Sequence, residues 1–198
     1  MSQAGYGTRR VGRQQAAAAD AAAPPPGRVA TALEANPKAH AALLAAGVRS
    51  VAVKPDGDCF PRSVAHSINT VLGGDVDHET VRKKVHCELR SNEEKYKPFL
   101  DTAAVSYQDF LAAAAHARTY TQGEVEICAA AAAFRLPVFV HCVDADCNVQ
   151  LRVRPETASG GGAEEPRIQL IHWNQLHYTA AVPVAAGDTE GETEPTAS

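Results

Sequence analysis

The residue best placed for covalent chemistry is Cys59, which follows the turn-forming sequence Asp56-Gly57-Asp58 and precedes an apolar-periodic segment. Gly tolerates the positive φ that a tight turn needs, and an Asp side chain can bond the backbone that follows it. Cys59 is therefore expected where a loop becomes a helix. Unsatisfied N–H groups and the helix dipole favour a thiolate there. The pattern predicts a nucleophilic thiol, exposed and raised by the bend.

A helix terminus alone does not activate such a thiol. It contributes about 0.3–1 kcal/mol, which is less than the ~1.4 kcal/mol that corresponds to one pKa unit. From an ordinary pKa of about 8.5, the thiol would stay mostly protonated at pH 7. A reactive Cys59 therefore needs a nearby imidazole, and such a base usually lies far away in the sequence. Each of the eight histidines is a candidate.

Three segments carry a resemblance to a known family. The segment 56–64 resembles the cysteine box of the ovarian tumour (OTU) deubiquitinases, usually Asp-Gly-Asn-Cys-Leu-Phe-Arg-Ala-Ile, and His177-Tyr178 resembles their histidine box. Residues 123–127 are similar to their middle Trp-Gly-Gly-x-x-Glu segment, although Thr121-Gln122 replaces Trp-Gly. The resemblance covers about residues 50–183. It implies a papain-like fold and a cysteine protease that removes ubiquitin or a ubiquitin-like modifier from conjugates.

The resemblance implies roles for the residues of the first two boxes. Cys59 would attack the carbonyl carbon of an isopeptide or peptide bond, and His177 would stabilise the thiolate and later protonate the leaving amine. The backbone N–H groups of Asp56, Gly57, Asp58 and Cys59 would form the oxyanion hole. Asp56 would shape that loop and is counted with the catalytic residues. His172 is a weaker candidate base, because no Tyr follows it.

The residue that orients the histidine stays open at this point. The family often has Asp or Asn two residues after the histidine, whereas this chain has Thr179. A hydroxyl can accept a hydrogen bond from the ring but supplies no charge to an imidazolium. Asn174, in the preceding loop, is a rival, and a Cys–His dyad without a third residue is another possibility. Asp58 is a further departure, since the family usually has Asn there.

Two aromatic residues near the histidine are candidates for the wall of a substrate channel. Trp173 and Tyr178 would line the narrow passage that admits the Gly-Gly tail of a ubiquitin-like substrate. For Trp173, packing in the core or under a loop is an equally open interpretation.

Composition argues against several other classes of protein. A formal net charge of −4 gives no general attraction to nucleic acid or an anionic membrane. No apolar run approaches the ~20 residues of a membrane span, and the N-terminus lacks a signal-peptide pattern. Five cysteines without framework spacing favour reduced thiols in a cytoplasmic compartment, which would be the host cytosol for a viral or bacterial protein. No Cys/His spacing completes a metal site, so no metal or cofactor is expected.

Periodicity predicts helices in the first part of the chain and strands in the last. Helices are expected at 29–46 with a break at Asn36-Pro37, and at 59–72, 78–91, 93–100, 106–118 and 123–135. Strands are expected at 48–53, 138–143, 149–153, 168–172 and 178–182. This order predicts an α+β (mixed α/β) fold, with a small, mainly antiparallel sheet packed against helices.

The ends of the chain differ in composition from its middle. Residues 1–27 read as a disordered leader and residues 185–198 as a disordered acidic tail. Residues 28–184 are left as the OTU-like catalytic domain, in which 155–166 is expected to be a mobile loop.

Three functions remain compatible with the sequence. The favoured one is a monomeric deubiquitinase that acts on ubiquitin or polyubiquitin, or on a ubiquitin-like modifier. A papain-like thiol protease that cleaves a polyprotein would use the same residues. A catalytically silent ubiquitin-binding module is the third, suggested by the missing acid at Thr179.

Overall fold

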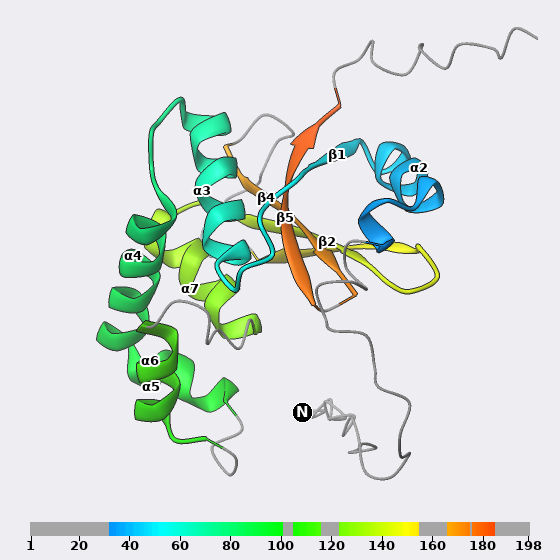
Figure 1. Cartoon of the computed structure of the whole chain (residues 1–198). Helices are drawn as coiled ribbons and strands as arrows, with labels where there is room; N and C mark the ends of the chain where they lie inside the picture. Colours follow the sequence, from blue (N-terminus) through cyan, green and yellow to red (C-terminus); the bar gives the residue numbers. More distant parts are fainter. Residues whose placement is uncertain (1–31, 101–104, 116–122, 155–165, 175, 185–198) are drawn as a thin grey trace, which may run out of the picture.

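The computed structural model describes residues 32–100, 105–115, 123–154, 166–174 and 176–184. The predicted leader 1–27, the predicted tail 185–198 and nearly all of the predicted loop 155–166 lie outside these residues. The described chain forms a five-stranded sheet with helices on both faces (Figure 1).

The sheet has the strand order β1-β5-β4-β2-β3. Its strands are β1 (Val48–Val51), β2 (Val138–Val143), β3 (Val149–Arg154), β4 (Ile168–Trp173) and β5 (His177–Pro183). Only the β2–β4 pair is parallel among these, and the other three neighbouring pairs are antiparallel. The expected mainly antiparallel sheet and the mixed α/β class are confirmed.

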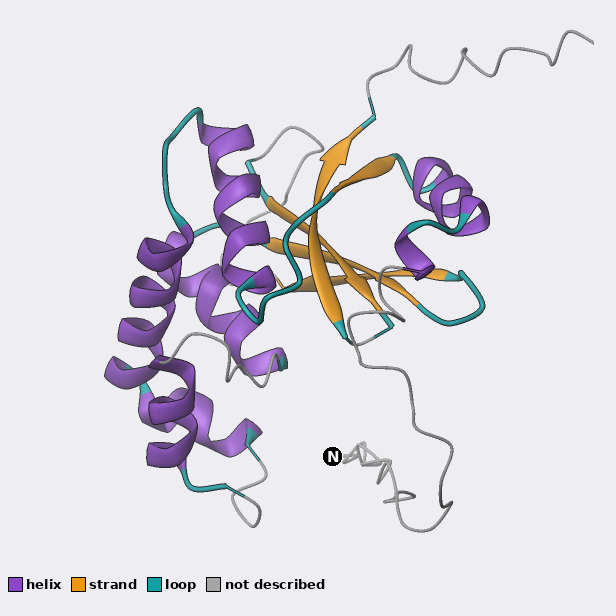
Figure 2. Ribbon diagram, in the orientation of Figure 1, coloured by secondary structure: helices purple, strands orange, loops and turns teal. Residues whose placement is uncertain are grey.

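The helices divide unequally between the two faces of the sheet (Figure 2). They are α2 (Pro37–Ala45), α3 (Cys59–Leu72), α4 (His78–Ser91), α5 (Glu93–Tyr96), the 3-10 helix η1 (Lys97–Phe99), α6 (Tyr107–Ala115) and α7 (Glu124–Phe134). All of them except α2 lie on the side of α3, and α2 lies on the other side (Figure 1). No helix of the described chain is long and apolar enough to cross a bilayer.

Local sequence signals explain where the main helices begin and end. Asn36 caps α2 by accepting a hydrogen bond from the Lys38 N–H at 2.9 Å, with Pro37 as the first helical residue. The Asp77 side chain caps α4 through the Thr80 N–H at 2.6 Å. Gly73 ends α3 in the left-handed region at φ 66°. The predicted bounds of α3, α4 and β2 are confirmed.

Strand alternation divides the buried residues into two groups. Tyr178 belongs to the large core cluster on the face of α3, α4 and α7. Trp173 and Ala181 belong to a smaller cluster on the face of α2. Since successive strand residues point to opposite faces, His177 and Thr179 share the face of Ala181.

Several strand ends differ from the prediction: β1 ends at Val51 instead of residue 53, and β3 and β5 end one residue later than expected. Trp173 was expected in the loop after β4 and His177 just before β5, but both belong to the strands. The reason is their antiparallel pairing, in which Trp173 is the direct partner of His177.

Candidate active site

The loop before α3 is the tight turn that its sequence predicts. Gly57 has a φ of 81°, and the Asp58 N–H donates to Asp56 Oδ1 at 3.1 Å. The Asp56 N–H donates to the Lys54 carbonyl at 3.0 Å. The positive φ requires glycine, and the Asp56 side chain closes the turn from within.

Two arginines hold the carboxylates of this loop. Arg62 reaches back from α3 to Asp56, with Nη2 3.1 Å from Oδ2 and Nε 3.4 Å from Oδ1. Arg82 of α4 pairs with Asp58, and the two side chains are only 9% and 10% exposed. Burial raises the pKa of Asp56, but the hydrogen bond and charge of Arg62 outweigh it and lower that pKa overall. Each of the two carboxylates of the loop is therefore paired with an arginine.

Cys59 is the first residue of α3, as predicted, but its surroundings differ from the prediction. Its exposed fraction is 3%, so the expected exposed and raised thiol is wrong. Cys59 belongs instead to the core cluster that contains Phe60 and Tyr178. The rings of Phe60 and Tyr178 meet edge to face, with their centroids 5.3 Å apart. Phe60, which follows Cys59, therefore contacts Tyr178, which follows His177.

His177 is the first residue of β5 and is 3% exposed. Burial lowers the pKa of its ring, partly opposed by a hydrogen bond to the Val53 backbone and by the charge of Asp56. Both Val53 and Asp56 belong to the segment that leads into Cys59. The structure therefore brings the histidine to the loop that presents the thiol, and burial favours the neutral ring that can accept a proton.

The four backbone donors predicted for the oxyanion hole are not equivalent. The N–H groups of Asp56 and Asp58 are both used inside the turn. The Cys59 N–H lies in the first turn of α3, and the Gly57 N–H lies in the turn before it. The oxyanion-hole role of these two donors stays a prediction.

The two predicted orienting residues have other contacts. The Thr179 hydroxyl accepts from Trp173 Nε1 at 2.8 Å and lies 2.8 Å from the Ser50 hydroxyl. Asn174 adopts a left-handed φ of 45°, and its N–H donates to the Val143 carbonyl at 2.7 Å. In the described chain no hydrogen bond connects either side chain to His177. Nε2 of His177 instead lies 3.2 Å from Oε1 of Glu34.

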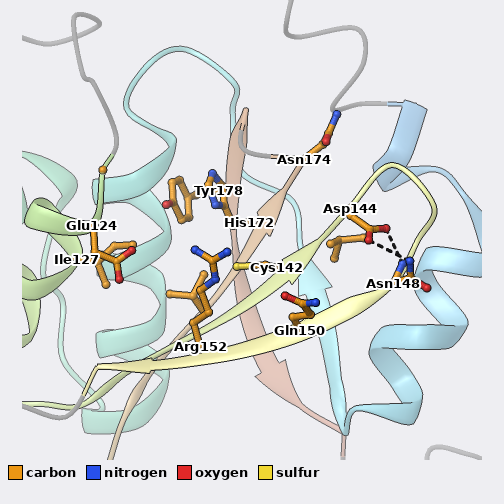
Figure 3. A pocket seen from close by; sticks show the side chains of 13 residues that line it. Glu124, Ile127, Cys142, Asp144, Asn148, Gln150, Arg152, His172, Asn174 and Tyr178 are labelled. Carbon is orange, nitrogen blue, oxygen red and sulfur yellow. Dashed lines mark hydrogen bonds between the residues drawn. The ribbon is translucent and has the colours of Figure 1, made fainter. Parts of the chain in front are cut away.

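The two predicted channel residues lie on opposite faces of the sheet. Trp173 has no exposed surface and packs beside α2, so its observed role is in the core. Tyr178 stacks on His172 with 4.0 Å between ring centroids, and burial raises its pKa. It borders a cavity of about 410 Å³ on the face of α3, together with Glu124, Arg152 and other residues (Figure 3). A channel role stays a prediction for both.

The middle segment begins α7 with a buried carboxyl group. Glu126 is 1% exposed, and its Oε2 accepts from the Gly123 N–H at 2.7 Å. Its Oε1 has no hydrogen-bond partner within the described part of the chain. Burial raises its pKa to about 7. The departure at Thr121-Gln122 lies outside the described residues.

The remaining cysteines and histidines do not gather into a metal site. No group of three or more His, Cys, Asp or Glu residues suited to a metal is present among the residues that the structure describes. All five cysteines lie in the described ranges and none forms a disulfide.

Sequence reasoning did not identify three residues that the structure brings to the site. Glu34 comes from the helical turn before α2, Ser50 from β1 and Arg82 from the middle of α4. None of them lies near a motif, and each is an ordinary residue in its own segment. A tertiary fold is needed to find them.

Comparisons with known proteins agree on one family. A family model described as OTU-like cysteine protease matches residues 54–176. The structure of the OTUD1 OTU domain is similar, with a TM-score of 0.59 and 19% identity over 73% of this chain and 92% of that one.

Two of the similar structures are described as complexes with ubiquitin. The Hazara virus OTU bound to ubiquitin has a TM-score of 0.51 and 23% identity, and covers 70% of this chain and 82% of its own. An OTU deubiquitinase from Wolbachia pipientis wMel bound to ubiquitin has a TM-score of 0.55 and 13% identity, and the match covers 70% of this chain and 97% of that one. No curated protein sequence matches this chain significantly.

Proposed function

The chain belongs to the OTU-like cysteine protease family, whose model matches more than half of it, and from this premise we propose that it is a deubiquitinase. Its substrate is a conjugate in which the C-terminal glycine of ubiquitin, or of a ubiquitin-like modifier, is joined to an amine. Two structures of similar fold are described as ubiquitin-bound, and this supports ubiquitin as the partner.

Cys59 and His177 carry the reaction in this proposal. The thiolate of Cys59 attacks the carbonyl carbon of the scissile bond, and the N–H groups of Gly57 and Cys59 stabilise the oxyanion. The oxyanion then collapses to a thioester as the C–N bond breaks, and protonated His177 gives its proton to the leaving amine. Neutral His177 next takes a proton from water, whose hydroxide attacks the thioester. The products are a free amine, a carboxylate and the regenerated thiol.

One observation carries the assignment of these residues. The ring of His177 is hydrogen-bonded to the Val53 backbone, and the charge of Asp56 raises its pKa. Val53 and Asp56 both belong to the segment that leads to Cys59. Because the Phe60 and Tyr178 rings are in contact, α3 and β5 are also fixed against each other one residue beyond the site. A thiol at a helix start and an imidazole at a strand start suit acyl transfer.

A ubiquitin probe with a C-terminal electrophile tests the proposal. The wild-type protein should become covalently linked to the probe at Cys59, and Cys59→Ala should abolish the linkage. Diubiquitin cleavage should be lost in both Cys59→Ala and His177→Ala. Cys87→Ala is the matched control, since Cys87 is an exposed thiol on α4 and should leave capture and cleavage intact.

The other two functions predict different outcomes of the same test. A protease of ordinary peptide bonds would cleave peptides without being captured by the probe. A silent binding module would hold ubiquitin without capture or turnover. Either result would contradict a deubiquitinase.

The catalytic domain of this proposal is residues 28–184, and its site requires Cys59 to remain a thiol. That requirement fits a reducing, cytoplasmic compartment.

A further inference from the structure

A carboxylate that no motif indicates lies close to Nε2 of His177. Glu34 Oε1 lies 3.2 Å from Nε2, and the two side chains are 23% and 4% exposed. This separation suits an ion pair. Nε2 has no hydrogen-bond partner in the described part of the chain, so the contact with Glu34 is one of charge and proximity.

Glu34 is held beside the histidine by its neighbours. Leu33 packs against the buried cluster of the α2 face, which contains Trp173, the strand partner of His177. The Leu33 carbonyl accepts from the Asn36 N–H at 3.0 Å, and the Glu34 carbonyl is contacted by His40 Nε2. The turn that carries Glu34 is therefore fixed both to the sheet and to the start of α2.

The residue that the family pattern would use has its hydroxyl engaged elsewhere. Thr179 shares the α2 face with His177, but its Oγ1 accepts from the Trp173 indole and pairs with Ser50. A hydroxyl has one proton and two lone pairs, so these two contacts leave little capacity for an imidazole. Thr179 also supplies no charge.

A carboxylate at Nε2 would supply what Thr179 lacks. Burial disfavours a charged His177 ring, so an imidazolium needs a nearby anion to form at neutral pH. The hydrogen bond to the Val53 backbone and a carboxylate at Nε2 would both favour the imidazolium that stabilises the Cys59 thiolate. Burial raises the pKa of Glu34, and the charge of His40 partly opposes this shift. Asp56, from the loop before α3, is the other charged group that acts on the ring.

We propose that Glu34 is the positioning residue of His177, with its carboxylate facing Nε2 in place of the acid that Thr179 does not provide. The inference rests on the proposed cysteine chemistry. It assigns the orienting group to a segment before α2, whereas the family pattern has it just after the histidine.

The test measures the alkylation of Cys59 by iodoacetamide from pH 5 to 10, with mass spectrometry of the Cys59 peptide and no ubiquitin present. Wild-type protein should show a reactive thiolate that persists below pH 7. In Glu34→Gln, which keeps the size and the acceptor oxygen but removes the charge, the rate near pH 6.5 should fall about 10-fold, the size of one pKa unit. The rate at pH 10, where any thiol ionises, should not change.

Three further variants separate positioning from packing. Glu34→Asp should recover part of the rate near pH 6.5, because it restores the charge. Thr179→Val should leave the pH profile unchanged. Glu94→Gln, on the exposed side of α5, changes the net charge equally and should also leave the profile unchanged. With a ubiquitin substrate, Glu34→Gln should lower kcat and leave KM unchanged.

The outcomes distinguish this inference from the proposed function. Probe capture by the wild type with an unshifted profile in Glu34→Gln would overturn the role of Glu34 alone. A shifted profile without probe capture would support Glu34 and overturn the ubiquitin substrate. A wild-type Cys59 that reacts only as an ordinary thiol would overturn both.

Discussion

The two halves of the candidate site are held in different ways. On the cysteine side, the turn and its carboxylates are fixed by charge, through Arg62 to Asp56 and Arg82 to Asp58. On the histidine side, β5 is fixed by neutral hydrogen bonds, in which Thr179 contacts Ser50 and the Trp173 indole. The cysteine side therefore holds charged side chains in the loop that precedes Cys59. The histidine side holds β5, whose His177 ring must gain and lose a proton during the reaction.

The two halves also differ in how far apart in sequence their partners lie. Asp56 contacts residues two and six positions later in the chain. Thr179 and Ser50 are separated by 129 positions. The cysteine side is therefore largely a local structure, and the histidine side exists only once the sheet has formed.

The largest expected effect comes from breaking the buried ion pair of the cysteine side. Arg82→Ala leaves the buried Asp58 with only the longer contact to Arg62 Nη2 at 3.9 Å, so the free energy of unfolding should fall by about 3 kcal/mol. Urea denaturation measures this. Adding Asp58→Asn to Arg82→Ala should recover part of the loss, because it removes the stranded charge. Lys83→Ala, exposed on the same helix, is the control, and equal stability of the two single variants would contradict the prediction.

A carboxyl group without a cation partner should respond to pH in the opposite way to Asp56. The pKa of Glu126 is raised from 4.5 to about 7. The folded protein therefore binds this proton more tightly, and the resulting stability is present below pH 4.5 and lost as pH rises through 7. From these pKa values the loss is about 3 kcal/mol. Glu126→Gln keeps an acceptor for the Gly123 N–H and should remove that loss.

Measuring unfolding of both proteins at pH 5 and pH 9 checks this expectation. The lowered pKa values of His141 and His177 also make stability depend on pH, with the opposite sign, but they act equally in both proteins. The stability of Glu126→Gln relative to wild type should therefore be higher at pH 9 than at pH 5. A difference that does not vary with pH would show that folding does not raise the pKa of Glu126.

The neutral hydrogen bonds of the histidine side should be worth less than the ion pair. Thr179→Val keeps the shape but leaves the buried Trp173 N–H without an acceptor, at an expected cost of about 2 kcal/mol in unfolding free energy. Thr179→Ser keeps the hydroxyl and is the matched control for the hydrogen bonds. If Thr179→Val and Thr179→Ser had the same free energy of unfolding, the hydrogen bonds of the Thr179 hydroxyl would not stabilise β5.

The sequence predicted the local half of the site and the order of the elements. The Asp56-Gly57-Asp58 turn, the start of α3 at Cys59 and the mixed sheet all follow from patterns within a few residues. The burial of Cys59 did not follow, because the core cluster that covers it is built from several distant elements.

The partners of the histidine side escaped prediction for the same physical reason. Thr179 was read as a possible acceptor for His177, since a strand pattern gives its face and not its neighbours across the sheet. Its partners come from β1 and β4. Contacts made by packing of distant elements need the fold itself.

The smallest stability effect tests whether the turn also has a chemical role. Gly57 and Gly47 have nearly the same left-handed φ, at 81° and 76°. Replacing either by Ala should cost about 1 kcal/mol, because a side chain disfavours that conformation. Only Gly57→Ala should also slow catalysis, by roughly 10- to 100-fold, since relaxation of the turn displaces the backbone donors from the oxyanion.

Gly47 is a fair control, because a Cβ placed there meets no atom within 4 Å and the residue lies at the end of α2. Comparing kcat and unfolding free energy for the two variants separates backbone strain from chemistry. Equal kcat values would mean that the turn only shapes the fold. If kcat falls only in Gly57→Ala, the turn that Arg62 and Arg82 hold in place also positions a backbone donor for the oxyanion. The neutral hydrogen bonds of the histidine side have no such role.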